Sequence, residues 1–280
     1  MDNMAMLQIK IYTRKFFRTL RKESIISIII GIIITLLVMA VTHKDMFANF
    51  EGTKSGMFSL ICVCIWIGIF NSIQLVCREK NDIVKDELDK SLKASSYMAA
   101  HFIYQAILCA IQSAIVFSIF YAFMLGKDAQ VGNPVAYLIT IFLIMYASDA
   151  MAFVISCAVP SPIVAMTVMP LLLLVQLVMA GVLFELKGVM SGVAFFTISK
   201  WGMQALGNIG NITDISSRLS QKFEGMPEPE SGWISQKDID AYGGGGGEMI
   251  LYWLIFITFI VAFYFLSVWA LKATTKRIKK

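Results

Sequence analysis

Six long stretches with almost no charged side chains set the strongest limit on what this chain can fold into. A helix needs roughly 20 apolar residues to cross the hydrocarbon core of a membrane. Four tracts reach that length by themselves, and a fifth at 129–184 fits two spans joined by a tight turn at Pro160-Ser161-Pro162. We therefore expect an all-α membrane protein whose six transmembrane helices cover about 24–42, 57–76, 100–125, 134–158, 162–184 and 249–271.

The composition agrees with a membrane domain. Hydrophobic residues make up 58% of the chain and charged residues only 15%, far from the balance of a soluble domain. In a chain of 280 residues, six spans leave room for one membrane domain at 24–271 and for no large soluble domain. The net charge of +5 does not indicate nucleic-acid binding, because the basic residues gather at the ends of the spans.

The positions of the basic residues predict the orientation. Residues 1–23 carry six of them, while the second loop at 78–93 and the tail at 272–280 carry five each. The first loop at 43–54 is short and weakly charged. Since lysine and arginine favour the cytoplasmic side, we expect both termini in the cytoplasm and a multi-pass protein of the cell membrane.

The chain carries few motifs of catalytic or metal-binding chemistry. All five cysteines lie within or at the edge of a predicted span, which predicts small packing residues and no disulfide framework. Cys62 and Cys64 would point to different faces of a helix, and the two histidines are far apart, so no metal site is expected. Glu248 follows the glycine run 243–247, which therefore fits a flexible tether and not a phosphate-binding loop. We expect no catalytic residue and no cofactor on this chain.

Asp149 is the one formally charged residue of the predicted fourth and fifth spans. An ionisable residue within a membrane span is by default a functional candidate. Asp149 fits a proton relay, a substrate contact or a packing residue that burial keeps neutral, and these three interpretations stay open. His101 lies near the inner end of the third span and fits a capping or snorkelling histidine.

The segment at 1–23 is amphipathic in helical phase, with Ile9, Tyr12, Phe16 and Leu20 on one face and basic residues nearly opposite. This pattern is typical of a helix in the inner membrane interface, the alternative being a simple basic flank. At 78–93, an apolar stripe lies among balanced charges, which favours docking onto another protein over a plain connector. The outer segment at 185–248 begins with apolar residues able to re-enter the membrane without crossing it.

Three ordered segments resemble the permease half of ABC exporters of the ABCG-like, type 2 class. QIKIYTRKFFRTLRKES is similar to that family's connecting helix ahead of the first span. The stretch from 71 to 105 resembles its loop with paired charges and a Ser-Tyr opening the third span, here Glu79-Lys80, Lys85 with Glu87, and Ser96-Tyr97. GVLFELKGVMSGVAFFTISKWGMQALGNI is similar to its re-entrant segment. Bacterial permeases associated with ABC ATPases and forkhead-associated domains are especially similar.

This resemblance implies a permease subunit that moves a substrate outward. Its implied partners are a second permease copy or a homologous permease, membrane lipid, and separate ABC ATPase subunits. ATP and Mg bind to those ATPase subunits. It implies a coupling helix that contacts the ATPase, with the candidate residues Glu79, Lys80, Val84, Lys85, Glu87 and Leu88. It also implies a pathway between the second and fifth spans, with the candidate residues Asn71, Gln74, Thr167 and Gln176, to which we add Asp149.

Two other functions fit the residues. The chain could be a membrane sensory or assembly protein whose outer segment at 185–248 binds a ligand and whose inner loop signals to a cytoplasmic partner. It could also be a secondary transporter that uses Asp149 for protons.

Overall fold

The protein is described by a computed structural model that covers residues 3–18, 22–44, 46–47, 50–88, 93–125, 132–183, 188–212 and 246–278. Within these residues all regular structure is helical, as the sequence predicts. The helices are α1 (Asn3–Arg18), α2 (Lys22–Thr42), α3 (Phe50–Ser72), α4 (Leu75–Leu88), α5 (Ala94–Met124), α6 (Pro134–Ala158), α7 (Pro162–Met179), α8 (Val189–Ala194), α9 (Ile198–Ile209) and α12 (Gly246–Ile278).

In the described part of the chain, six helices are long and apolar enough to cross a membrane, which confirms the predicted number. They are Ser24–Thr42, Phe50–Lys80, Ala94–Met124, Pro134–Ala158, Pro162–Met179 and Gly247–Lys276. Several ends differ from the predicted bounds, because helical hydrogen bonding continues past the apolar core into polar turns. The fifth span is shorter than expected, since Gly181 adopts a positive φ of 75° just after the end of α7.

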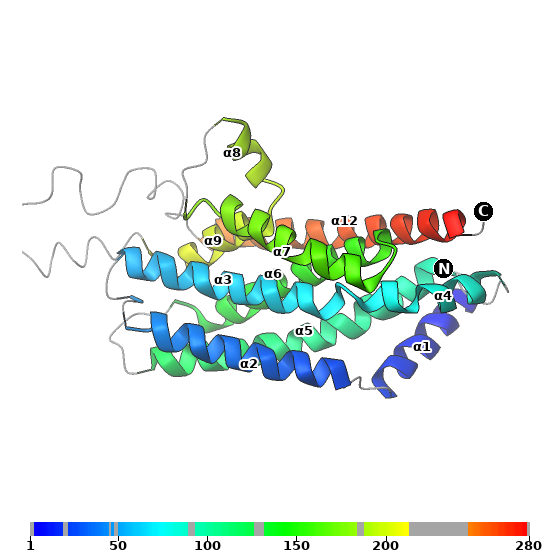
Figure 1. Cartoon of the computed structure of the whole chain (residues 1–280). Helices are drawn as coiled ribbons and strands as arrows, with labels where there is room; N and C mark the ends of the chain where they lie inside the picture. The colour runs from blue at the N-terminus through cyan, green and yellow to red at the C-terminus, as the bar shows by residue number, and fades with distance from the viewer. Residues whose placement is uncertain are drawn as a thin grey trace, which may run out of the picture.

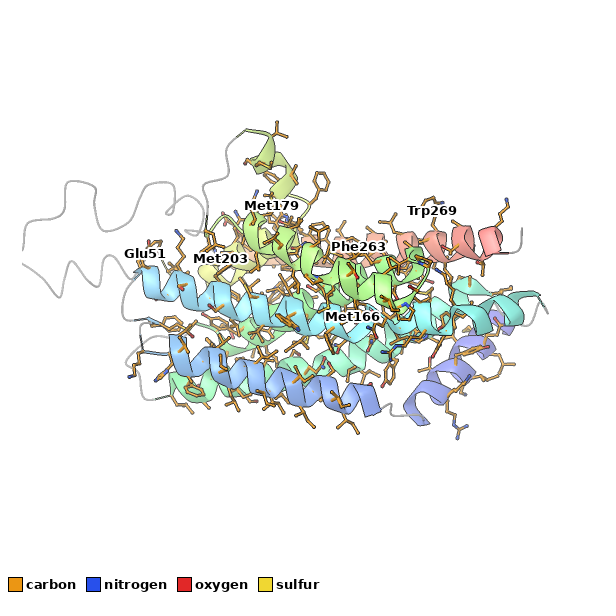
Figure 2. All side chains as sticks on the ribbon, viewed as in Figure 1. Glu51, Met166, Met179, Met203, Phe263 and Trp269 are labelled. Carbon is orange, nitrogen blue, oxygen red and sulfur yellow. The ribbon has the colours of Figure 1, made fainter. Side chains whose placement is uncertain are left out.

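The helices α3 and α6 form the centre of the bundle, and α2, α7 and α12 lie around them with most of their surface exposed. Figure 2 shows the side chains that fill the space between them. Gly68 of α3 fits directly against the backbone of α6, because a Cβ atom there would lie 2.3 Å from the carbonyl oxygen of Met145. Small residues at such contacts let two membrane helices approach closely.

Both chain ends lie at one end of the bundle, near α1 and α4, while α8 and α9 lie at the opposite end (Figure 1). This arrangement agrees with an even number of spans. The short helix α9 is buried against α3, α6 and α12, whereas α8 exposes Val189 and the adjacent Phe196. Trp201 of α9 donates a hydrogen bond to the Phe195 carbonyl at 2.8 Å, which ties the two helices together. Most of the expected outer segment, at 213–245, lies outside the described residues.

The fit of Gly68 gives a test of the α3–α6 contact. Replacing Gly68 with alanine forces the two helices apart, and we expect a loss of about 1–3 kcal/mol in folding stability. Thermal unfolding of the purified protein in detergent measures the change in stability. The readout is the decrease of the monodisperse peak in size-exclusion chromatography with rising temperature. Gly192→Ala in α8 is the matched control, since nothing lies within 4 Å of its Cβ position. Equal melting temperatures for the two variants would contradict the contact.

Candidate functional site

A break in the second span separates α3 from α4 at Ile73 and Gln74. The backbone N–H groups at the start of a helix have no partner within the helix itself. Here the N–H groups of Val76 and Cys77 donate to Ser156 Oγ of α6, at 3.0 and 3.2 Å. Ser156, which is 80 residues from Val76 in the sequence, therefore caps the N-terminal end of α4.

Lys80 closes a second connection between α4 and α6. Its ammonium group donates to the carbonyl oxygens of Cys157 and Val159, at 2.9 and 2.7 Å, where α6 ends. A cation at the C-terminal end of a helix satisfies the last carbonyls and interacts favourably with the helix dipole. Thr274 of α12 donates to the same Cys157 carbonyl at 3.1 Å, so three helices meet at this point.

Glu79 connects α4 to α5. The Tyr97 hydroxyl donates to Glu79 Oε2 at 2.5 Å, and His101 Nε2 lies 3.8 Å from the same oxygen. The Tyr97 and His101 rings are in edge contact at 4.5 Å, and Tyr12 of α1 packs on Tyr97 at 6.1 Å. This cluster therefore joins α1, α4 and α5 at one end of the bundle.

The six predicted coupling residues thus divide into two groups. Glu79 and Lys80 point toward neighbouring membrane helices and fix the position of α4. The remaining four have their backbone in α4, but their side chains lie outside the described residues: Val84, Lys85, Glu87 and Leu88. Sequence reasoning missed Ser156, because nothing in its local pattern distinguishes it from other serines in membrane helices.

Asn71, one of the predicted pathway residues, takes part in a network between α2, α3 and α5. Its amide oxygen accepts from Ser27 Oγ at 2.6 Å, and its amide nitrogen donates to Gln112 Oε1 at 2.7 Å. Hydrogen bonds between membrane helices contribute modestly to their association. Asn71 is therefore engaged in holding three helices together.

Asp149 is completely enclosed between α3 and α6, close to Gly68. Ser72 donates a hydrogen bond to Asp149 Oδ1, and Gln105 Nε2 of α5 donates to Ser72 Oγ at 2.9 Å. Asp149 Oδ2 has no hydrogen-bond partner among the described residues. Of its three interpretations from sequence, this enclosure favours the packing residue. Ser72 and Gln105 were not predicted from sequence, and only the packing of α5 against α3 reveals them.

Gln74 and Thr167 are the two pathway candidates that the structure brings together. Both line an open recess of about 430 Å³ between the α3–α4 break and α7, with Arg78, Ile163 and Met166. Thr167 is exposed and donates back to the Ile163 carbonyl at 3.0 Å.

Gln176 lies apart from that recess and is buried. It accepts a hydrogen bond from the backbone N–H of Ser199 at 3.1 Å, and its amide nitrogen lies 3.6 Å from Met151 Sδ. It therefore ties α7 to the start of α9 and to α6.

Six spans, with α3 and α6 at their centre and with the second span broken near the chain ends, define a multi-pass membrane protein. The chain belongs to the ABC-2 type transporter family, whose family model matches residues 7–210. No curated protein matches the chain. Membership makes it a permease, the membrane component of an ABC transporter, and such components generally carry no catalytic site and act with an ABC ATPase. The narrower association with forkhead-associated domains stays a prediction.

The Lys80 clamp gives a second prediction. Lys80→Met keeps the length of the side chain but removes the charged donor from the Cys157 carbonyl, which keeps Thr274 as a donor, and from the partly buried Val159 carbonyl. We expect a loss on the order of 2–3 kcal/mol, because hydrogen bonds to charged groups are the stronger ones and unsatisfied buried groups are costly. The melting temperature in detergent measures it.

The control for this change is Lys272→Met, at an exposed position of α12. It removes the same charge near the same end of the bundle. If Lys272→Met destabilises the protein as much as Lys80→Met, the clamp does not contribute to stability.

Proposed function

We propose that this chain is the membrane subunit of an ATP-driven exporter, which moves a substrate outward when a separate ABC ATPase subunit binds and hydrolyses ATP. The observation that carries the proposal is the match to the ABC-2 type transporter family over residues 7–210, together with a broken second span that ends in the clamped helix α4. ATP and Mg belong to the partner ATPase. The chain itself contributes no catalytic residue.

In this proposal α4 is the coupling helix. Closure of the ATPase subunits around ATP displaces Glu87 and Leu88, at the end of α4. Lys80 passes the displacement to the end of α6 and so to the turn that begins α7, while Glu79 passes it to α5. The membrane helices then change from inward-open to outward-open, as a shift of population between two states.

The proposed substrate pathway runs between α3 and α7 of this chain and of a second permease, either an identical copy or a homologue. Gln74 and Thr167 would contact the substrate, since both line the recess beside α7. The three other candidates would support the pathway from behind, through their hydrogen bonds between helices: Asn71, Asp149 and Gln176.

The proposed topology follows from charge. The interfacial helix at 1–23, the coupling loop at 78–93 and the tail at 272–280 lie on the cytoplasmic side, and the segment at 185–248 lies outside. Lipid headgroups contact the basic face of α1, whose Lys10 and Arg14 are exposed, and the protein resides in the cell membrane.

Family membership favours the exporter over the two alternatives from sequence, a sensory or assembly protein and a proton-coupled transporter. Enclosure of Asp149 also weighs against the proton-coupled transporter, because a proton carrier needs access to water on each side in turn.

The proposal is tested by variants at the far end of α4. A tagged chain purified from native membranes should bring an ABC ATPase with it, and the double variant Glu87→Arg, Leu88→Arg should lose that partner. In the reconstituted complex, Glu87→Ala or Leu88→Ala should reduce transport severalfold or more, because in this proposal both residues contact the ATPase. The melting temperature of each variant shows whether it still folds.

Glu51→Ala is the control, since Glu51 is exposed at the opposite end of the bundle. Recovery of the chain without any ATPase would refute the exporter. Normal coupling in all the α4 variants would instead refute the assignment of α4 as the coupling helix.

A further inference from the structure

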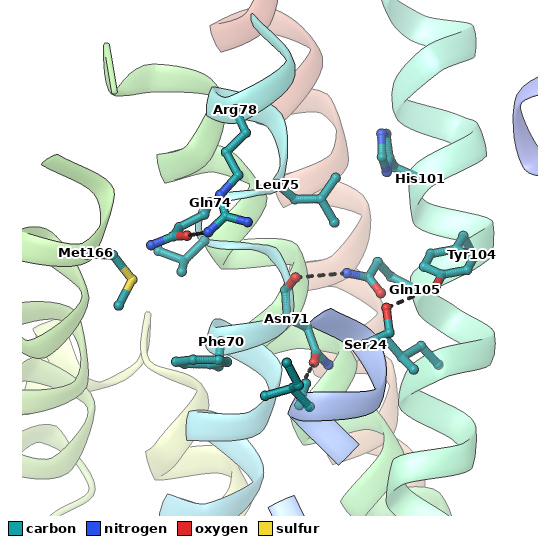
Figure 3. A pocket seen from close by; sticks show the side chains of 14 residues that line it. Ser24, Phe70, Asn71, Gln74, Leu75, Arg78, His101, Tyr104, Gln105 and Met166 are labelled. Carbon is teal, nitrogen blue, oxygen red and sulfur yellow. Dashed lines mark hydrogen bonds between the residues drawn. The ribbon is translucent and has the colours of Figure 1, made fainter. Parts of the chain in front are cut away.

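A partly enclosed cavity of about 160 Å³ lies between α2, α5 and the break that separates α3 from α4. Figure 3 shows its lining side chains, which come from all of these helices and from Met166 of α7. The cavity carries hydrogen-bonding side chains on its inner wall, a cation at one end and apolar residues at its side opening, and each of these features constrains a ligand.

The inner wall is held in place by hydrogen bonds within the protein. Gln105 is 1% exposed, and its amide nitrogen donates to Ser72 Oγ and to the Asn71 carbonyl, at 2.9 and 3.3 Å. Its amide oxygen is enclosed and has no hydrogen-bond partner among the described residues. Gln105 therefore supports the wall from behind.

The same wall is otherwise polar and well ordered. Ser24 Oγ and the Tyr104 hydroxyl share a hydrogen bond of 3.1 Å beside Gln105, and Asn71 is held by Ser27 and Gln112. The groups that face the cavity are thus fixed by bonds to one another, and they need no rearrangement to receive a ligand. Binding to a preorganised site loses less free energy in ordering the protein.

The cation is Arg78, on the first turn of α4. Its guanidinium donates to Gln74 Oε1, which holds it at the end of the cavity (Figure 3). A guanidinium presents five N–H donors and is the preferred partner of phosphate and carboxylate groups, so it can bind Gln74 and an anion together. An anionic group of a ligand at this end would therefore meet a cation.

The side opening is apolar. Ile26 of α2 and Met166 of α7 line the cavity and are also exposed, at 51% and 38%. Ile26 continues into the row of exposed isoleucines along α2, which includes Ile29 and Ile33 and has the composition of a lipid-facing surface. A ligand that fills the opening has an apolar part that leaves the cavity sideways, between α2 and α7.

We propose that this cavity binds the headgroup of a membrane phospholipid. The phosphate contacts Arg78, the polar part of the headgroup lies against the hydroxyl groups of Ser24 and Tyr104, and the acyl chains leave between Ile26 and Met166. This cavity shares Gln74, Arg78 and Met166 with the recess beside α7, and it differs from that recess by its inner wall on α2 and α5. The proposal concerns binding alone and holds whether or not the chain exports a substrate.

The test uses the purified full chain and a phosphatidylglycerol that carries a photoreactive diazirine in one acyl chain. The second arm uses phosphatidylethanolamine with the same diazirine in one acyl chain. The third arm adds free glycerol phosphate as a competitor of the labelled phosphatidylglycerol. In the wild type, we expect crosslinks on the peptides containing Ile26 and Met166, and one phospholipid retained per chain in native mass spectrometry. Glycerol phosphate should compete weakly, because it lacks the acyl chains.

Two variants and two controls make the result specific. Arg78→Gln removes the anion partner, and Ile26→Trp obstructs the opening; each should reduce site-specific crosslinking at least tenfold. The controls are Lys272→Gln, an exposed lysine of α12, and Ile29→Trp, an exposed α2 residue that does not line the cavity. Both should crosslink like the wild type, and melting temperatures identify any variant that fails to fold.

Three results would overturn the proposal. Crosslinks spread evenly over the exposed faces of α2, α7 and α12 would indicate ordinary surrounding lipid. Glycerol phosphate that competes as well as the whole lipid would identify a soluble phosphate ester as the ligand. Equal crosslinking in Arg78→Gln and in the wild type would show that Arg78 does not bind the phosphate. An ATPase partner is needed for none of these measurements, so failure of the exporter proposal would leave them unaffected.

Discussion

No water reaches the hydrocarbon core of a membrane to satisfy a backbone N–H or C=O group, so a spanning helix can be broken only where other parts of the protein provide the missing partners. The break at Ile73 and Gln74 meets this condition through Ser156, which caps the start of α4. Lys80 of α4 then donates hydrogen bonds to the carbonyl groups at the end of α6. The position of α4, and with it any role of α4 in coupling, depends on these reciprocal hydrogen bonds between α4 and α6.

The same need for hydrogen-bond partners within the protein explains how polar residues are distributed in the bundle. Asn71 and Ser72 of α3 form hydrogen bonds to neighbouring helices, Ser72 to Asp149 of α6, because α3 and α6 are the most enclosed spans and a buried polar group without a partner is costly. Gln74 lies in the break itself, and it lines the recess beside α7 instead.

A rigid α4 is also what the proposed mechanism requires. A helix that moved independently of the membrane domain would absorb a displacement by the ATPase without passing it on. Here Glu79 and Lys80, adjacent in the sequence, bind α5 and α6 respectively, so that α4 cannot rotate or slide without moving both. The cavity proposed to bind a phospholipid borders the same break, so its occupation would affect the position of α4.

The sequence by itself determined the number of spans, the all-helical class and, through ordered motifs, the family, because hydropathy and motif order are local properties that need no partner. It did not determine what the polar residues do: Asn71, Asp149 and Gln176 were predicted together as pathway residues, and the structure distributes them among separate hydrogen-bond networks. Only the tertiary structure decided this. A hydrogen bond such as that of Lys80 joins residues 77 positions apart, and its partner follows from how the helices pack, which the sequence of either helix alone leaves open.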